Sequence, residues 1–417
     1  MAGRRWAGAG LALALTATLL FACDKATLVF EVDSPRALVD QAVRIRVTGA
    51  PADGSVTVEA TGTDRTGRTW RASADFRADH AGVVDLSTSP VASGSYRGVD
   101  GMGLFWSMNP DGGDGDSDIF IPASTDGGRS YEIRLSAAVD GHVAASTTVR
   151  RVITADGVTK RVLDRDGIVG TLFTPPDGAP RRPGVLLIGG SEGGPGPITD
   201  AALLASHGYP SLAVGYFHEP GLPQTLKDIP MEYFATAARL LGKEPSVAGP
   251  AVVAFGYSRG TEAAMLLAEF SPELVRGVIL YAPTDRVGGG FPDGGFAWTH
   301  DGQPVLLGPL PVAHVAGPVM AIAGGTDEVW ASYLAAPALR TSLDAAHPDQ
   351  HHVVLAYRDA GHLVGTFPYY PSPVRLVHPV TKRLMSLGGS RLADEAARAD
   401  GYPKVLAFLD ELATVTR

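Results

Sequence analysis

The chain has 417 residues, a formal net charge of −9 and a single cysteine. One compact core seldom serves so long a chain, so the length predicts two domains. The sequence contains no run of clustered Lys and Arg residues, which argues against nucleic acid as a partner. The lone cysteine does not indicate a disulfide.

The N-terminus reads as an export signal. Arg4 and Arg5 precede an apolar stretch, Ala7–Ala22, which is short for a membrane span of about 20 residues. Cys23 follows at once, as in a bacterial lipobox, where cleavage leaves a lipid-modified cysteine at the N-terminus. We predict a lipoprotein-type signal peptide at 1–22 and an extracytoplasmic protein anchored to the membrane through lipidated Cys23. A soluble secreted protein, an uncleaved anchor and a misassigned start are the alternatives.

Residues 26–152 alternate between apolar and polar side chains with a period of two. Val43–Val47 and Val56–Ala60 are examples, and glycine, aspartate and proline turns separate such runs. Short strands at this spacing, without a long helix, predict an all-β immunoglobulin-like sandwich domain.

An acidic stretch, Asp111–Asp118, contains the D-x-D-x-D spacing that opens a calcium loop. It lacks the glycine at the sixth position and the glutamate at the twelfth, where Ile119 and Thr125 stand. A solvated acidic turn is therefore favoured over a calcium site. We predict no metal and no cofactor.

Beyond residue 154 the pattern changes, and we predict a C-terminal domain over 155–417 in which strands and helices alternate. Such alternation predicts a largely parallel sheet with helices on both faces. Residues 286–316 interrupt it and form either a lid or a plain surface excursion. Strands are expected at Gly167–Phe173, Val185–Ile188, Ser211–Tyr216, Ala251–Phe255, Gly277–Tyr281, Val319–Ala323 and Val353–Tyr357, and helices at Ile198–His207, Ile229–Leu241, Thr261–Phe270, Val329–Leu343 and Arg391–Leu412.

The first chemical motif is Gly256-Tyr257-Ser258-Arg259-Gly260, which lies between a predicted strand and a predicted helix. In that context G-x-S-x-G marks a nucleophile elbow, a tight turn that presents the serine hydroxyl to a substrate. The two glycines remove the side chains that would clash in such a turn. We predict Ser258 as a nucleophile, against the simpler interpretation of a helix N-cap.

A serine nucleophile needs a base and an acid, which α/β-hydrolases supply in the order Ser, Asp, His. Asp327 and His362 each follow the end of a predicted strand, where ligands bind in open α/β sheets. Asp327 has rivals in Glu328 and Asp285. His362 competes with ten other histidines, and its position after a strand in Ala-Gly-His favours it. The fold prediction is therefore an α/β-hydrolase domain preceded by the sandwich.

The negative oxygen formed during acyl transfer needs two backbone donors. One is expected to be the amide of Arg259, directly after the nucleophile. The other is expected from the glycine-rich loop after Val185–Ile188, from Gly190, Ser191 or Glu192, and the sequence does not decide among these. The loop lacks the Lys-Ser/Thr ending of a phosphate-binding loop and the spacing of a dinucleotide fingerprint.

The chain resembles the family of acyl-CoA thioesterases and bile acid-CoA:amino acid N-acyltransferases over nearly all of its length after the signal. Gly94–Met108 looks like that family's N-domain signature, and Gly189–Gly194, the Ser258 elbow, Asp327 and Ala360–His362 add to the likeness. The resemblance implies a β-sandwich joined to an α/β-hydrolase domain. It also implies a nucleophile–Asp–His triad that acts on an acyl thioester.

The nucleophile is serine in many thioesterases of this family and cysteine in the acyltransferase that conjugates bile acids. Ser258 therefore favours hydrolysis, because an oxygen ester intermediate passes its acyl group to water. Thr261 departs from the family pattern, since it follows Gly260 where a second glycine is expected.

We predict a serine hydrolase that cleaves acyl thioesters through an acyl-enzyme intermediate. The alternatives are an N-acyltransferase that conjugates an acyl group to an amino acid, a carboxylesterase outside the cytoplasm, and a binding lipoprotein that retains a hydrolase shell. An exported lipoprotein would not meet cytosolic acyl-CoA. Either its substrate is another ester or thioester, or the export prediction is wrong. The sequence does not indicate acyl chain length, leaving group or oligomeric state.

Overall fold

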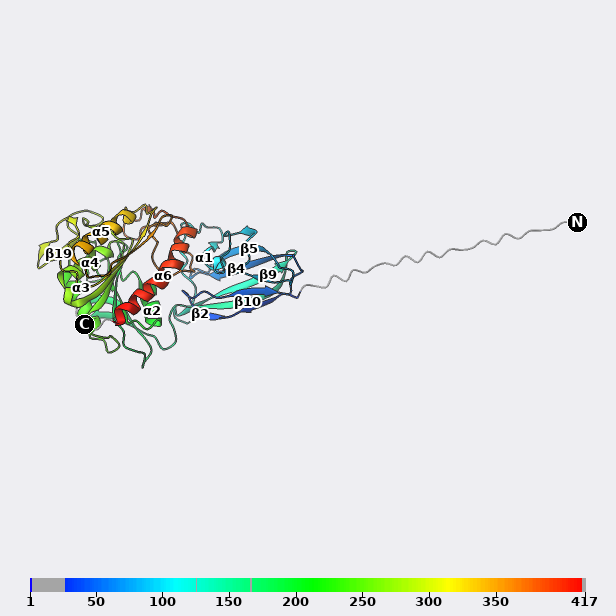
Figure 1. Ribbon diagram of the computed structural model, residues 1–417, viewed down its shortest axis with the longest axis horizontal. Coiled ribbons are helices and arrows are strands. Elements are labelled where there is room, and N and C mark those ends of the chain that lie inside the picture. The colour runs from blue at the N-terminus through cyan, green and yellow to red at the C-terminus, as the bar shows by residue number, and fades with distance from the viewer. Residues whose placement is uncertain (2–26, 125, 166, 415–417) are drawn as a thin grey trace.

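The computed structural model describes Met1 and residues 27–124, 126–165 and 167–414. Apart from Met1, the predicted signal peptide lies outside the described residues, as does Cys23. Figure 1 shows two parts side by side: a β-rich part in blue and cyan, and a larger part in green to red where helices pack around a sheet. Within the described ranges no helix is both long and apolar enough to cross a bilayer.

The N-terminal part is built from two sheets that share one core. Along β4 the side chains of Val56, Val58 and Ala60 are fully buried while their neighbours are not. The common core also takes Ile45 and Val47 from the smaller sheet. The result is a two-sheet sandwich, and its immunoglobulin-like character stays a prediction. The smaller sheet contains β1 (Val29–Val32), β3 (Ile45–Thr48) and β6 (Val84–Asp85), and the larger β2 (Arg36–Leu38), β10 (His142–Val152), β9 (Ser130–Val139), β4 (Ser55–Thr63), β5 (Thr69–Arg77), β7 (Ser93–Gly94) and β8 (Asn109–Pro110).

The C-terminal part is organised by one eight-stranded sheet. Its second strand runs antiparallel to both neighbours, and the remaining strands are parallel. This order, with one reversed strand near an edge, is that of the α/β-hydrolase fold and confirms the predicted fold class. The strands are, in spatial order, β11 (Thr159–Arg165), β12 (Ile168–Thr174), β14 (Ser211–Gly215), β13 (Val185–Ile188), β16 (Val252–Tyr257), β17 (Val275–Tyr281), β22 (Val319–Gly324) and β23 (Val353–Tyr357).

Helices cover both faces of this sheet, which explains why its central strands are buried along their whole length. One face packs on α3 (Met231–Gly242), α4 (Gly260–Phe270) and α5 (Ser332–Ala346), with the short η1 (Pro272–Leu274) after α4. The other face packs on α2 (Ile198–Ser206) and α6 (Arg391–Thr414). The predicted helices and strands of this domain recur with small shifts at their ends. Among the strands of the eight-stranded sheet, β11 is the one that the sequence analysis missed.

The two parts meet along α6, which Figure 1 shows in red between the sheet and the sandwich. The Arg391 guanidinium, at the first turn of α6, donates to the carbonyl oxygens of Trp106 and Met108, both at 2.6 Å. Trp106 ends α1 (Gly103–Trp106), inside the predicted signature segment. Tyr402 of α6 joins the sandwich core. The predicted domain limits at 152 and 155 stay a prediction. They fall between β10 and β11.

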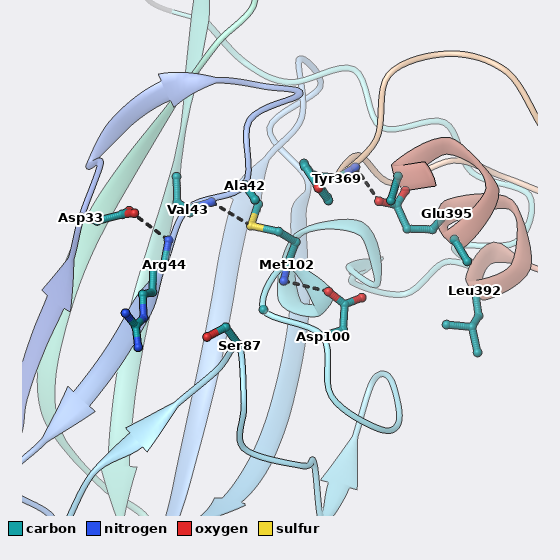
Figure 2. A pocket seen from close by; sticks show the side chains of 13 residues that line it. Asp33, Ala42, Val43, Arg44, Ser87, Asp100, Met102, Tyr369, Leu392 and Glu395 are labelled. Carbon is teal, nitrogen blue, oxygen red and sulfur yellow. Dashed lines mark hydrogen bonds between the residues drawn. The ribbon is translucent and has the colours of Figure 1, made fainter. Parts of the chain in front are cut away.

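A cavity of about 510 Å³ lies beside this junction. Figure 2 shows Glu395 of α6 facing it together with Asp100 and Met102 of the sandwich part. The Glu395 carboxylate accepts the backbone N–H of Tyr369 at 2.6 Å and pairs with Arg398 at 3.1 Å. Even with this partner, burial raises the pKa of Glu395 to about 7.

Residues 286–316 are fastened to α4. Neither predicted alternative, a lid or a plain surface excursion, included such an attachment. Trp298 is fully buried, and its indole N–H donates to a Glu262 carboxylate oxygen at 2.9 Å. Glu262 also accepts the backbone N–H of Gly288 at 3.0 Å, so the segment is fastened to α4. Its short strands are β18 (Arg286–Val287), β19 (Trp298–His300), β20 (Gln303–Pro304) and β21 (Gly308–Pro309), with β19 beside β15 (Ile229–Pro230).

Candidate active site

Ser258 occupies a strained turn between β16 and α4. Its φ of +52° lies in the left-handed region that non-glycine residues rarely adopt. The flanking glycines have no room for side chains. A Cβ on Gly256 would lie 2.4 Å from the Gly260 carbonyl oxygen, and one on Gly260 would lie 2.2 Å from that of Ile188. The geometry is that of a nucleophile elbow.

The three side chains predicted from sequence meet at the end of the sheet. The Ser258 Oγ lies 2.9 Å from His362 Nε2, and His362 Nδ1 lies 2.9 Å from Asp327 Oδ2. With the proton on Nδ1, the ring donates to Asp327 and leaves Nε2 free to accept from the serine. The imidazole and both of its partners therefore form one hydrogen-bonded series.

The Asp327 carboxylate is held ionised by its surroundings. Burial opposes the charge, but the hydrogen bond from His362 and others from Ser332 and the Val329 amide outweigh it and lower the pKa of Asp327. The Ser332 hydroxyl donates to Oδ2 at 2.7 Å, and the amides of Val329 and Trp330 donate to Oδ1 at 2.9 and 3.2 Å. An ionised Asp327 fixes the tautomer of the imidazole at neutral pH.

The loop that carries His362 is fixed by backbone contacts that sequence analysis missed. The His362 N–H donates to the Leu387 carbonyl at 2.7 Å, and the preceding Gly361 N–H donates to Asp394 Oδ1 at 2.6 Å. Asp394 lies in the first turn of α6 and is almost fully buried. The Trp330 ring meets the imidazole edge-on, with centroids 5.4 Å apart.

The Glu192 carboxylate reduces the number of loop amides that are candidates to donate a hydrogen bond to the oxyanion. The Gly190 N–H, one predicted donor, points to Glu192 Oε1 at 2.9 Å and is therefore engaged. The Glu192 carboxylate also interacts with the amide of Glu192 itself, while burial raises its pKa. Ser191 is the remaining candidate in the loop, and its role as a donor stays a prediction. The Arg259 amide lies at the N-terminus of α4, where helical amides have no partner within the helix.

The Arg259 side chain takes no part in the reactive end of the site. Its guanidinium pairs with Glu262 at 3.1 Å and donates to the Gly289 carbonyl at 2.8 Å. Both contacts tie the elbow to the anchored segment 286–316. Only the backbone of Arg259 is therefore available to a reacting group.

Ser258 and His362 open into a cavity of about 550 Å³. A hairpin of β24 (Arg375–Val377) and β25 (Leu384–Ser386) supplies part of its apolar wall, in a region where the sequence predicted no regular structure. Ile119 of the sandwich part also lines it, whereas the lining contains none of residues 286–316. A mostly apolar chamber beside a serine–imidazole pair can hold an acyl chain and bring its carbonyl carbon to the serine.

The remaining candidates from the sequence do not approach the imidazole. The structure pairs His362 with Asp327 and with neither Glu328 nor Asp285. His352 is 3% exposed, and its Nδ1 accepts a hydrogen bond from the Val319 N–H. In the acidic stretch Asp111–Asp118, carboxylates pair with Arg68, Arg71 and Arg375.

Two comparisons of sequence cover most of the chain. Residues 40–165 match the acyl-CoA thioester hydrolase/BAAT N-terminal region, and residues 229–287 and 306–414 match the BAAT/acyl-CoA thioester hydrolase C-terminal region. Acyl-coenzyme A thioesterase 6 of Mus musculus is 29% identical in an alignment 408 residues long that covers 90% of this chain and 94% of the relative. Acyl-coenzyme A amino acid N-acyltransferase 1 of Mus musculus is 29% identical in an alignment 403 residues long that covers 89% of this chain and 94% of the relative.

Among solved structures, the chain is similar to a dienelactone hydrolase-like promiscuous phosphotriesterase from metagenomic libraries. The TM-score is 0.40 at 17% sequence identity, and the match covers 61% of this chain and 99% of that one. A putative dienelactone hydrolase from Klebsiella pneumoniae subsp. pneumoniae gives a TM-score of 0.39 at 15% identity, with 61% of this chain and 98% of that one covered.

Proposed function

Because this chain belongs to the acyl-CoA thioester hydrolase/BAAT family, we propose that it hydrolyses acyl thioesters with Ser258 as nucleophile, His362 as general base and Asp327 as the partner of the base. The observation that carries the proposal is the pair of 2.9 Å contacts from Ser258 to His362 and from His362 to Asp327. The apolar cavity on the Ser258 side supports it, because an acyl chain needs such a chamber.

In the first half-reaction, Ser258 Oγ attacks the thioester carbonyl carbon while His362 Nε2 takes the hydroxyl proton. The amides of Ser191 and Arg259 donate to the oxyanion that forms. The C–S bond then breaks, and the proton passes from the imidazolium to the leaving sulfur. The acyl group stays on Ser258 as an oxygen ester.

In the second half-reaction, a water molecule gives a proton to His362 and attacks the ester carbonyl. The C–O bond to Ser258 breaks, Ser258 recovers its proton from the imidazolium, and a carboxylic acid leaves. Asp327 stabilises the imidazolium in both halves and stays ionised throughout. Besides the thioester, water is the only reactant that the two halves need.

The test is a panel of acyl thioesters and aryl esters with the wild type and Ser258→Ala. The variant should lose about 10⁴-fold or more in kcat, while Ser342→Ala, an exposed serine on α5, should keep its rate. A fluorophosphonate probe should label the wild type on Ser258. A Ser258→Ala protein as active as the wild type would end the proposal. Adding glycine or taurine and identifying the products by mass separates hydrolysis from transfer to an amine.

A second candidate is a carboxylesterase or a thioesterase whose leaving group is not coenzyme A. The lining of the cavity contains neither Lys nor Arg, the side chains that usually bind phosphates, and coenzyme A carries several phosphates. Comparing acyl-CoA with the acyl-N-acetylcysteamine thioester of the same acid decides this. A kcat/KM at least 10-fold higher for acyl-CoA would indicate a coenzyme A site, and equal values would favour the second candidate.

We also propose that the mature chain begins at Cys23 and is lipidated there. The proposal rests on the charged start and the apolar stretch of the sequence. In Figure 1 the described part of the sandwich begins at its end remote from the hydrolase part. Mass spectrometry of the protein from a bacterial membrane fraction should find a diacylated Cys23. An intact Met1 in the purified protein would refute the proposal.

A further inference from the structure

The mechanism above leaves one buried carboxylate in the reactive cavity without a task. Asp200, in the first turn of α2, lines the same cavity as Ser258 and His362 and is only 8% exposed. Burial raises its pKa to about 6, since no Lys or Arg is among the residues that line this cavity. A buried acid without a basic partner costs stability, so it calls for a reason.

Asp200 is tied to the loop that follows His362. The Thr366 hydroxyl donates to Asp200 Oδ1 at 2.9 Å. Thr366 has a φ of +145°, which is strained for a β-branched residue. The preceding Gly365 lies so close to the Tyr281 ring that a Cβ there would come within 2.0 Å of it. The loop therefore packs tightly against the Tyr281 ring, and the Thr366 hydroxyl faces the Asp200 carboxylate.

A second polar group in this wall interacts with Asp200. The hydroxyl of Tyr257, the residue before the nucleophile, is buried, and its hydrogen-bonding interaction with Asp200 lowers the pKa of that carboxyl. It lies close enough to Asp200 for the carboxylate to raise the pKa of Tyr257, together with burial. Both residues line the cavity. A mostly apolar chamber therefore contains the Asp200 carboxylate and the Tyr257 hydroxyl near its nucleophile.

We propose that Asp200 and Tyr257 form a polar subsite in the acyl cavity that selects acyl groups carrying a hydrogen-bond donor, an amine or a hydroxyl, over plain hydrocarbon acyl groups. This inference rests on the proposed thioester hydrolysis and names its substrate class. A carboxylate in an apolar wall disfavours the binding of a hydrocarbon acyl chain. Such an acyl chain displaces water from the carboxylate and offers no hydrogen-bond donor in its place. An ammonium or hydroxyl group on the chain satisfies it.

The experiment compares N-acetylcysteamine thioesters that differ in one atom group: 3-methylbutanoyl, 3-hydroxybutanoyl and 3-aminobutanoyl. Heptanoyl and 6-hydroxyhexanoyl thioesters extend the comparison to a deeper position. The readout is the ratio of kcat/KM within each set on one protein sample, which does not depend on the fraction of folded protein. We expect the amino and hydroxy substrates to exceed the methyl substrate by about 10-fold or more in the wild type.

Two variants separate recognition from a structural tether. Asp200→Asn keeps the shape and an acceptor for Thr366, and should remove most of the preference for the amine while leaving the methyl substrate no worse. Thr366→Val removes the tether but leaves the carboxylate, and should keep the preference.

Equal rates for all three short substrates in the wild type, with no preference in the longer pair, overturn the subsite and leave thioester hydrolysis standing. A preference lost in Thr366→Val and kept in Asp200→Asn would overturn it as well. Failure of the wild type on every thioester would instead count against the proposed function.

Discussion

Asp394 accepts the backbone N–H of Gly361 at 2.6 Å, and Gly361 directly precedes His362. This contact joins the C-terminal helix α6 to the loop that carries His362, the proposed general base. One turn earlier, Arg391 fastens the same helix to the carbonyls of Trp106 and Met108 in the sandwich part. The position of the imidazole is thereby coupled to the contact between the two parts of the molecule.

Asp394 is therefore expected to act as a positioning residue. Asp394→Ala leaves a buried amide without an acceptor and should lower kcat by about 10-fold to 100-fold with a small change in KM. Asp394→Asn, which keeps an acceptor oxygen, should recover most of the rate. Asp400→Ala, an exposed acid on the same helix paired with Lys404, is the matched control. Steady-state kinetics on one thioester checks all three, and equal kcat for Asp394→Ala and the control would contradict the prediction.

Asp327→Asn tests the orientation of the imidazole. An amide at this position donates a proton to Nδ1, so the ring places its own proton on Nε2 and can no longer accept from Ser258. We expect kcat to fall by about 10³-fold to 10⁴-fold without loss of folding. The neighbouring Glu328→Gln, which does not contact His362, serves as control. If the two variants lose the same small factor, Asp327 is not the partner of the base.

Gly190→Ala tests the closeness of the loop to the nucleophile. The added Cβ would lie 2.8 Å from Glu192 Oε2 and 2.9 Å from the Ser258 Cβ, so the loop must move. Displaced oxyanion donors lower kcat, and we expect a loss of about 10²-fold or more. Gly289→Ala, whose Cβ would meet one oxygen at 3.3 Å and which does not line the cavity, should keep most of the rate. Initial rates and thermal unfolding of both proteins provide the comparison.

Glu395 makes stability depend on pH. Its pKa is raised to about 7, first by burial and then by Asp100, against the opposing effect of Arg398 and the Tyr369 amide. The folded protein therefore holds a proton that the unfolded chain releases at lower pH. The free energy of unfolding should fall as pH rises from about 4.5 to 7, by at most about 1.4 kcal/mol per pH unit.

Glu395→Gln removes this titration and should flatten the pH dependence in that window. Urea unfolding between pH 5 and 8 measures it, with Glu411→Gln, an exposed acid near the end of α6, as the reference. Parallel curves for Glu395→Gln and the wild type would show that Glu395 titrates normally.

The residues of the candidate site that could be predicted from sequence are those with a local signature. Ser258 lies between two glycines, and Asp327 and His362 each follow an apolar strand with a glycine turn, so short-range pattern alone placed them at one edge of the sheet. The strands of the sheet were predictable for the same reason, because burial on both faces makes them continuous apolar runs.

The supporting contacts could not be predicted, because they join positions far apart in the chain. Asp394 reaches Gly361 from a different element, and Asp200 reaches Thr366 across most of the C-terminal part; neither carboxylate has a local motif. Edge strand β11 was missed because it carries charged residues such as Lys160 and Asp164, as edge strands do. The engagement of the Gly190 amide by Glu192 could not be predicted either, because it depends on the orientation of the glutamate side chain.

Because the chain is synthesised from its N-terminus, α6 is the last described element to be made, and the loop of His362 depends on it. The serine elbow and the strand before Asp327 are translated well before Arg391 and Asp394, which belong to the last element of the chain that the structure describes. Domains fold progressively as they emerge from the ribosome, yet the histidine loop cannot be fixed until α6 has been made. A chain stopped before residue 391 would thus present a nucleophile without an aligned base.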